Sequence, residues 1–282
     1  MQNRLETKKF KGYDVVKGYP EDGWLKGYFY AKEEDIKTGV GDMVESYRDL
    51  GFIKHKDYIL NLLDINKGDK VLDVGCAHGA MMVYCGLLGA EIYGIDISPE
   101  LVKTANQYLD KFKIKGEAIS SDAKNIDFPE NSFDKAVSAD FFEHLSKEEN
   151  IAVLKEIRRV LKPGGVLIIK TPNIAYLRLA KLYKQIKRIL SFKNPFDVII
   201  PHTVGTDPQH IGLTTRKDMV KMIQAAGFSN FTFYYGINSK IERHHYMAGE
   251  MLSESSFFRD LVTEEIIVKI YKPIITSFFK EG

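Results

Sequence analysis

Short apolar runs alternate with helical patterns between residues 70 and 169, and this alternation constrains the fold more than any other feature of the sequence. The runs are Lys70–Val74, Glu91–Ile95, Glu117–Ser120, Phe133–Ser138 and Val166–Ile169. Between them lie helical signals, such as Ser98 and Pro99, an N-cap residue followed by a first-turn proline. Strands that alternate with helices at this spacing predict βαβ units and a parallel sheet, with ligands at the carboxyl ends of its strands. We therefore expect an α/β fold with a doubly wound, mostly parallel sheet in a three-layer αβα sandwich.

The alternation also divides the chain. We expect an N-terminal cap region over residues 1–54, the core over 55–172, a basic helical insertion or lid after the fifth strand over 173–209, and the C-terminal completion of the core with the substrate region over 210–282. Thr214 or Thr215 is expected to cap a helix that ends at Gly227, and residues 228–235 alternate like a strand. The last 45 residues carry no pattern that predicts a helix or a strand.

Composition limits the setting in which the chain works. The two cysteines, Cys76 and Cys85, form no CxxC pair and match no zinc-ligand spacing, so we expect a reducing, cytoplasmic environment. The first ten residues lack the apolar region of a signal peptide, and no apolar stretch reaches the roughly 18 residues of a membrane span. Neither secretion by a signal peptide nor a transmembrane anchor is expected.

Basic side chains are concentrated in one segment. The whole chain has 40 basic and 38 acidic residues, a net charge of +2. Residues 174–193 contain six basic residues and no acidic one, so the other 262 residues sum to 34 minus 38, or −4. The low net charge therefore hides one strongly basic element in a mildly acidic chain.

This basic segment has the pattern of an amphipathic helix. At about 100° per residue, its two kinds of side chain fall on opposite sides. The apolar side carries Leu179, Leu182, Ile186, Ile189 and Leu190, and the basic side carries Arg178, Lys181, Lys184, Lys187 and Arg188. Three interpretations stay open: a helix on the sheet with a solvated face, peripheral contact of 174–193 with an anionic membrane surface, or a cap for a phosphorylated or acidic acceptor. Nucleic-acid binding is not expected, because the rest of the chain is net acidic.

A glycine-containing turn follows the first strand, with the sequence DVGCAHG from Asp73 to Gly79. Such a turn lets the backbone approach a ligand closely. Asp96 ends the second strand, where a carboxylate can accept both hydroxyls of an adenosine ribose. A nicotinamide site needs G-x-G-x-x-G, but the aligned residues here are Gly75, Ala77 and Ala80. The Asp73 carboxylate would repel a pyrophosphate and suits a ligand that carries an ammonium and a sulfonium.

Four segments together carry a family resemblance. They are VLDVGCAHG (71–79), YGIDISPE (93–100), SDAKNIDFPENSFDKAVSADFFEHL (121–145) and EIRRVLKPGGVLIIKTPN (156–173). In this order and spacing they resemble the class I S-adenosylmethionine-dependent methyltransferases, in particular the ubiquinone-biosynthesis and small-molecule group. The resemblance implies a Rossmann-like fold, S-adenosyl-L-methionine as cofactor and S-adenosyl-L-homocysteine as product. Ala77 departs from the family, which usually has glycine there, and its methyl group could crowd the cofactor.

The resemblance also implies a set of cofactor-binding residues. Gly75, Cys76 and Gly79 would line the methionine moiety with Asp73 near its amino group, Asp96 and Ile97 would hold the ribose and the adenine face, Asp122 and Ala123 the adenine edge, and Ala139 would lie beside the methionine chain. Asp134 is expected to be a structural carboxylate at the start of its strand. Cys76 is expected to contribute packing and a backbone contact rather than a catalytic thiol.

Methyl transfer from a sulfonium is an in-line displacement, and a general base is needed only if the acceptor is protonated. His144 and His210 are the candidate catalytic residues, with structural roles as the alternative. Asp140, Glu143 and His144 form D-x-x-E-H, which resembles a metal-binding pattern in some quinone O-methyltransferases; we favour a solvated surface and expect no metal. His244 and His245 are interpreted as surface residues, with an active-site role as the alternative.

The aromatic residues of the cap region have two open interpretations. Tyr19, Trp24, Tyr28 and Tyr30 would form a lid over cofactor and acceptor, or would pack against the edge of the sheet.

The predicted function is methyl transfer from S-adenosylmethionine to an oxygen or nitrogen of a small-molecule acceptor, such as a sugar, a lipid-linked intermediate or a secondary metabolite. One alternative is a non-catalytic S-adenosylmethionine-binding regulatory or scaffold protein, and a more distant one is an NAD-dependent oxidoreductase. We expect a cytoplasmic location, peripheral at the inner membrane surface if the basic helix binds lipid. The sequence does not predict the acceptor or the oligomeric state.

Overall fold

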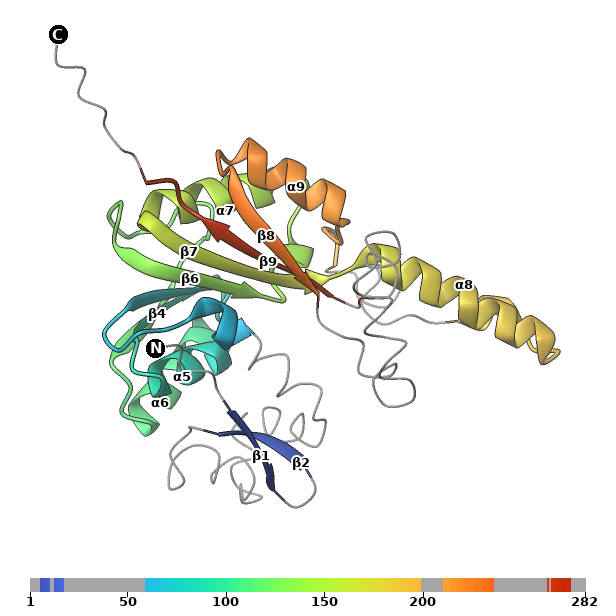
Figure 1. Ribbon diagram of the computed structural model, residues 1–282, viewed down its shortest axis with the longest axis horizontal. Helices are drawn as coiled ribbons and strands as arrows, with labels where there is room; N and C mark the ends of the chain where they lie inside the picture. The colour runs from blue at the N-terminus through green and yellow to red at the C-terminus, as the bar shows by residue number, and fades with distance from the viewer. Residues whose placement is uncertain are drawn as a thin grey trace, which may run out of the picture. The chain divides into compact units, whose positions relative to one another are not determined.

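The computed structural model describes residues 6–10, 13–17, 59–198, 210–235, 263 and 265–274 (Figure 1). These residues belong to two compact units. The first unit holds the residues up to 137 together with 159–168, and the second holds 138–158 and the residues from 169 onward. The first unit includes an antiparallel pair of strands, β1 (Glu6–Phe10) and β2 (Tyr13–Lys17).

A seven-stranded sheet in the order β5-β4-β3-β6-β7-β9-β8 is the framework of the described residues. Its strands are β3 (Lys70–Val74), β4 (Glu91–Asp96), β5 (Gly116–Ser120), β6 (Phe133–Ala139), β7 (Leu161–Pro172), β8 (Asn230–Tyr235) and β9 (Glu265–Tyr271). β3 pairs in parallel with β4 and β6, β4 pairs in parallel with β5, and β8 pairs antiparallel with β9. The chain runs outward from β3 to β5 and then returns to place β6 on the other side of β3, which is the doubly wound order. The predicted α/β fold with a mostly parallel sheet is therefore confirmed.

Helices connect the strands, and side-chain caps fix where several of them begin. The helices are α5 (Ala80–Leu87), α6 (Pro99–Lys111), α7 (Lys147–Val160), α8 (Ile174–Leu190) and α9 (Arg216–Ala225), with short 3₁₀ helices η2 (Phe142–His144) and η3 (Pro195–Asp197). The Ser98 hydroxyl accepts a hydrogen bond from Leu101 N, and Thr215 caps α9, as the sequence predicts. At the start of α7, the side chains of Ser146 and Glu149 each accept from the other's backbone N–H, forming a capping box.

The core surrounds the central strand. Val71, Leu72 and Val74 of β3 are each 0% exposed, so this strand is buried on both of its faces. Continuous apolar runs of this kind are typical of parallel strands that are covered on both sides. None of the described helices has both the length and the apolar character needed to cross a membrane.

Two segments differ from the sequence predictions. The strand predicted over Val166–Ile169 is longer in the structure, because β7 begins at Leu161 and includes Gly164, which has a φ of 79°. The C-terminal region contains β9, for which no prediction was made. Its run of apolar residues at 266–268 is too short to distinguish a strand from a buried helical segment by periodicity, and only its place beside β8 decides it.

Candidate functional site

The turn after β3 has a backbone that can approach a ligand closely. Gly75, Ala77 and Gly79 all have left-handed φ values, of 76°, 46° and 83°. The N–H groups of Gly75 and Cys76 both donate to Ile95 O at the end of β4, at 2.9 and 3.0 Å. At these two positions the turn therefore has Cα and carbonyl groups to offer a ligand, because the N–H groups are already bound.

Asp96 organises the loops at this edge of the sheet. Its Oδ2 accepts a hydrogen bond from Ala77 N in the turn after β3, and its Oδ1 accepts one from Ser98 N, both at 2.9 Å. Its backbone carbonyl accepts one from Ser121 N, at 3.0 Å, in the loop after β5. A carboxylate has about four lone-pair positions, so about two are left after these bonds, as many as the two hydroxyls of a ribose would use.

Asp73 and Cys76 are buried beside this turn. Asp73, at the carboxyl end of β3, is 3% exposed, and Cys76 is 5% exposed. Burial raises the pKa of the Cys76 thiol far above its usual range, and the negative charges of Asp73 and Asp96 raise it further. A raised pKa disfavours the thiolate form, in line with the packing role that the sequence predicts for Cys76.

The loops after β4 and β5 carry the predicted adenine-binding residues. Ile97 is 77% exposed, which is unusual for a large apolar side chain directly after a buried strand. Ala123 is buried, whereas Asp122 is exposed and accepts a hydrogen bond from Lys124 N at 2.9 Å. The first unit thus has an uncovered apolar side chain next to Asp96, suited to contact with a flat base.

Ala77 and Gly79 occupy positions that differ in how well they tolerate a side chain. Ala77 has the left-handed backbone that a glycine adopts more readily, so the expected crowding by its methyl group comes with local backbone strain of about 1 kcal/mol. A Cβ atom on Gly79 would lie 2.8 Å from the Cβ of Ala105 in α6. Gly79 therefore also allows α5 to pack closely on α6.

The second unit has a buried lysine between two carboxylates. Lys170 Nζ in β7 lies 2.8 Å from Asp140 Oδ1 and 2.7 Å from Glu265 Oε1. Burial by itself would lower the pKa of Lys170, but the carboxylates of Asp140 and Glu265 raise it above its usual range. Asp140 follows Ala139 at the end of β6, has a left-handed φ of 58°, and donates its N–H to Lys170 O at 3.0 Å. Sequence analysis did not single out Lys170 or Glu265, because neither belongs to a motif.

Glu143 is buried, and its predicted place on a solvated surface is wrong. It is 1% exposed, and its Oε2 accepts a hydrogen bond from the Thr171 hydroxyl at 2.9 Å. Burial raises the pKa of Glu143 to about 7, with a further contribution from the negative charge of Asp140. Within the D-x-x-E-H pattern, Asp140 binds Lys170 and Glu143 binds Thr171, so the two carboxylates have different hydrogen-bond partners.

The two candidate catalytic histidines lie together. The rings of His144 and His210 are 4.6 Å apart between centroids and meet edge to face. Gly212 N donates to Glu143 O at 2.8 Å, which fixes the His210 segment against η2. Ligand atoms of Glu143, His144 and His210 lie within 4.8 Å of one another, so among the described residues this set is spaced to share a proton or a cation. The sequence identified both histidines but not their contact.

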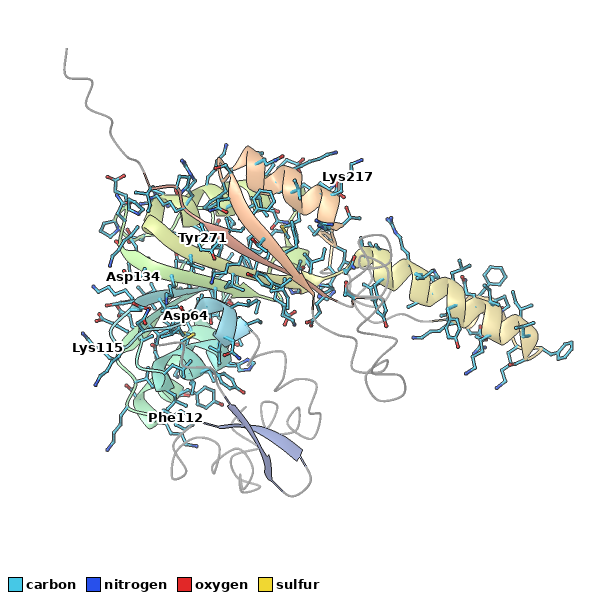
Figure 2. All side chains as sticks on the ribbon, in the orientation of Figure 1. Asp64, Phe112, Lys115, Asp134, Lys217 and Tyr271 are labelled. Carbon is cyan, nitrogen blue, oxygen red and sulfur yellow. The ribbon has the colours of Figure 1, made fainter. Side chains whose placement is uncertain are left out.

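Asp134 has the structural role that its position predicts (Figure 2). Its carboxylate accepts hydrogen bonds from Lys70 N at 3.0 Å and from Lys162 Nζ at 2.6 Å. Burial would raise the pKa of Asp134, but these two partners lower it below its usual value. Tyr19, Trp24, Tyr28, Tyr30, His244 and His245 lie outside the described residues, so their predicted roles stay predictions.

The described residues thus combine a doubly wound sheet, a glycine-containing turn after β3 and a carboxylate, Asp96, at the end of β4, as the resemblance to class I S-adenosylmethionine-dependent methyltransferases implies. Residues 72–169 match the family described as "Methyltransferase domain". These residues are a methyltransferase domain of that class, and S-adenosylmethionine is its cofactor. The predicted resemblance is confirmed.

Curated relatives share part of their length with this chain. Sterol 24-C-methyltransferase of Pneumocystis carinii is 32% identical over 55% of this chain and 39% of its own length. Phosphoethanolamine N-methyltransferase of Plasmodium falciparum is 35% identical over 49% of this chain and 52% of its own. Ubiquinone biosynthesis O-methyltransferase of Xanthomonas oryzae pv. oryzae is 32% identical over 42% of this chain and 48% of its own. The chain therefore spans about two fifths to one half of the length of these relatives.

The fold also resembles a solved structure. Phosphoethanolamine N-methyltransferase 2 of Haemonchus contortus, solved with phosphomonomethylethanolamine and S-adenosylhomocysteine, aligns with a TM-score of 0.56 at 19% identity. The match covers 78% of this chain and 53% of the other. At this identity, the likeness concerns the fold alone.

Proposed function

We propose that this protein is an S-adenosylmethionine-dependent methyltransferase that methylates an oxygen or a nitrogen of a small-molecule acceptor. The observation that carries the proposal is the position of Asp96, whose carboxylate joins the glycine turn to the following loop and keeps acceptor sites for a ribose. When bound, the cofactor supplies a methyl group on a sulfonium, which needs no further activation.

The chain's own residues would hold the cofactor by its two ends. Asp73 and the turn from Gly75 to Gly79 would bind the amino-acid end, where a buried carboxylate compensates the ammonium charge. Asp96 would bind the ribose hydroxyls, and the exposed Ile97 would cover the base. The main catalytic contribution of these cofactor-binding residues would then be to orient the methyl group toward the acceptor.

His144 and His210 would serve as the general base when the atom to be methylated carries a proton. A ring nitrogen of one of these histidines would take up the proton that the acceptor atom loses on methylation; the cofactor, which supplies the methyl group, would be left as S-adenosylhomocysteine. The neighbouring Glu143, at 1% exposure, would compensate the resulting imidazolium charge from a buried position.

The proposed acceptor class rests on the names of the relatives and on the paired histidines. The names of the relatives specify a sterol carbon, the nitrogen of phosphoethanolamine and an oxygen in ubiquinone biosynthesis, so small acceptors are common to them while the methylated atom differs. We favour oxygen or nitrogen here because the paired histidines suit an acceptor that loses a proton. Sugars, lipid-linked intermediates and secondary metabolites meet this requirement. We also propose a cytoplasmic location, since Cys76 and Cys85 are both buried and neither is part of a disulfide.

Two measurements test the proposal. Isothermal titration calorimetry with S-adenosylhomocysteine should show binding by the wild type and a loss of about a hundredfold in Asp96→Ala, with Asp110→Ala as a control at an exposed carboxylate outside the predicted site. Formation of S-adenosylhomocysteine from S-adenosylmethionine should then be followed with a panel of hydroxyl and amine acceptors. Binding without turnover for any acceptor would favour the regulatory or scaffold alternative, and displacement of the ligand by NAD would favour the oxidoreductase.

A further inference from the structure

Helix α8 leaves its apolar side uncovered. Seventeen residues long, it has a single buried apolar side chain, Leu177. From Leu179 to the end of the helix the large apolar side chains are exposed: Leu179 42%, Leu182 53%, Tyr183 65%, Ile186 48%, Ile189 57% and Leu190 76%. Figure 1 shows α8 extending beyond the end of β7, away from the strands of its own unit, and Figure 2 shows side chains along its whole length. The interpretation of α8 as a helix lying on the sheet is therefore wrong.

The exposed apolar side chains form one continuous face. At about 100° per residue, the positions from Ile189 to Tyr183 cover an arc of about 120° that contains no charged residue. The basic side chains lie in the rest of the circumference and span about 180° of it. They are Arg178, Lys181, Lys184, Lys187 and Arg188. This division between an apolar arc and flanking cations is what a helix lying in a membrane interface requires.

Two exposed phenylalanines follow the helix. Phe192 is 101% exposed and has a left-handed φ of 53°, a conformation that normally selects glycine or asparagine after a helix. Phe196 in η3 is 86% exposed. Arg188 Nη2 binds Asp197 Oδ2 at 2.7 Å and holds this segment against the helix end. A bulky aromatic side chain in a strained, fully exposed position is an independent sign of an apolar partner.

We infer that α8 and the segment to Phe196 form a docking surface for a bilayer that contains anionic lipids. Residues 174–193 carry six positive charges and no negative one, so a second copy docked through the same face would bring two such sets together. A small acidic acceptor would use only the basic arc and would leave the apolar arc in water. An anionic membrane satisfies both arcs, with the apolar side chains among the acyl chains and the cations at the headgroups.

This docking surface goes beyond the proposed function, because it does not depend on which acceptor is methylated. The cofactor-binding residues Asp73 to Asp122 belong to the first unit and α8 to the second. Cofactor affinity and membrane affinity are therefore measurable as separate properties of the same variants.

Vesicle sedimentation of the full chain tests the inference. The probes are vesicles of phosphatidylcholine alone and vesicles with phosphatidylglycerol added to about a third of the lipid. We expect binding to the anionic vesicles at low salt and about a hundredfold weaker binding when Lys181, Lys184 and Lys187 are changed to Gln, because each cation near an anionic surface contributes several-fold. The matched control changes three exposed lysines elsewhere, Lys103, Lys217 and Lys221, to Gln and should leave binding within about twofold.

A second variant separates insertion from simple charge attraction. Leu182, Ile186 and Leu190, changed together to Ser, keep every charge but remove the apolar arc, and binding should again fall at least tenfold. Circular dichroism and S-adenosylhomocysteine binding check that these variants are folded. Equal sedimentation of wild type and both triple variants would overturn the inference, as would a wild-type dimer in light scattering that the Leu182, Ile186 and Leu190 variant converts to a monomer.

Discussion

The candidate-site residues of the two units are held in different ways. In the first unit, Asp96 is bound by backbone N–H groups, and residues with left-handed backbone form the turn beside it. In the second unit, charged and polar side chains bind one another: Lys170 lies between Asp140 and Glu265, and Thr171 binds Glu143. A site made from backbone needs only a few small residues and one carboxylate, whereas a site made from paired side chains depends on every partner.

The difference affects stability first, and the largest expected effect is at Lys170. Lys170→Met leaves the carboxylate of Glu265, 13% exposed, without its cation. Removing one partner of a buried ion pair costs about 3 to 5 kcal/mol of unfolding free energy, which urea denaturation measures. The control is Lys115→Met, which breaks a pair with Glu91 at a side chain that is 78% exposed and should cost less than about 1 kcal/mol. Equal losses in the two variants would mean that the charges of the second unit are not coupled as described.

Substitution of the paired histidines should affect catalysis without affecting cofactor binding. In His144→Ala we expect turnover of an acceptor found in the panel to fall about a hundredfold, the usual contribution of a general base. S-Adenosylhomocysteine affinity should stay within about twofold, because His144 is not among the predicted cofactor-binding residues. The double variant with His210→Ala should lose less than the sum of the single losses, because the rings are in contact.

A chelator tests whether the same residues bind a metal ion instead of accepting a proton. If the histidines accept a proton, EDTA should leave the wild-type rate unchanged. If EDTA abolishes turnover and added Zn²⁺ or Mn²⁺ restores it, Glu143, His144 and His210 hold a metal ion and the general-base role is wrong.

Glu143 predicts a dependence of stability on pH. Its pKa is raised from 4.5 to about 7 by burial, so the folded state binds a proton more readily than the unfolded chain does. Stability contributed by the protonated form is complete below pH 4.5 and is lost as the pH rises through 7. Glu143→Gln cannot ionise, so its unfolding free energy should exceed that of the wild type by more at pH 8 than at pH 5. A difference that does not change with pH would contradict the raised pKa.

The smallest expected effect is in the backbone turn. Ala77→Gly relieves a left-handed backbone and should stabilise the protein by up to about 1 kcal/mol, partly offset by the entropy of glycine in the unfolded chain. Gly75→Ala makes the opposite change at a φ of 76° and should destabilise it by a similar amount. Thermal unfolding of the two variants compares them, and destabilisation by Ala77→Gly would show that the Ala77 methyl group contributes packing that outweighs the strain.

The same contrast explains how much the sequence predicts. The Asp73 to Gly79 turn and Asp96 are local patterns, and the cap at Ser98 is read from adjacent residues. Lys170 and Asp140 are 30 residues apart, and Thr171 and Glu143 are 28 apart. Pairs at this separation have no fixed spacing, so the sequence does not reveal the partner of Glu143. It therefore predicts a solvated surface for a side chain that is buried. The exposure of the apolar side of α8 was equally beyond prediction, because periodicity reveals two sides but not what covers them.

Asn173, the last residue before α8, has a mechanical consequence. Its Oδ1 accepts from Ala175 N at 3.0 Å, and its Nδ2 donates to Thr263 O at 2.9 Å, so one 2% exposed side chain joins the first turn of the helix to a segment 90 residues away. A hinge at this point would have to break both hydrogen bonds in a buried setting. The start of α8 is therefore fastened to the segment at Thr263, and a pull on the helix would act first on these two buried hydrogen bonds.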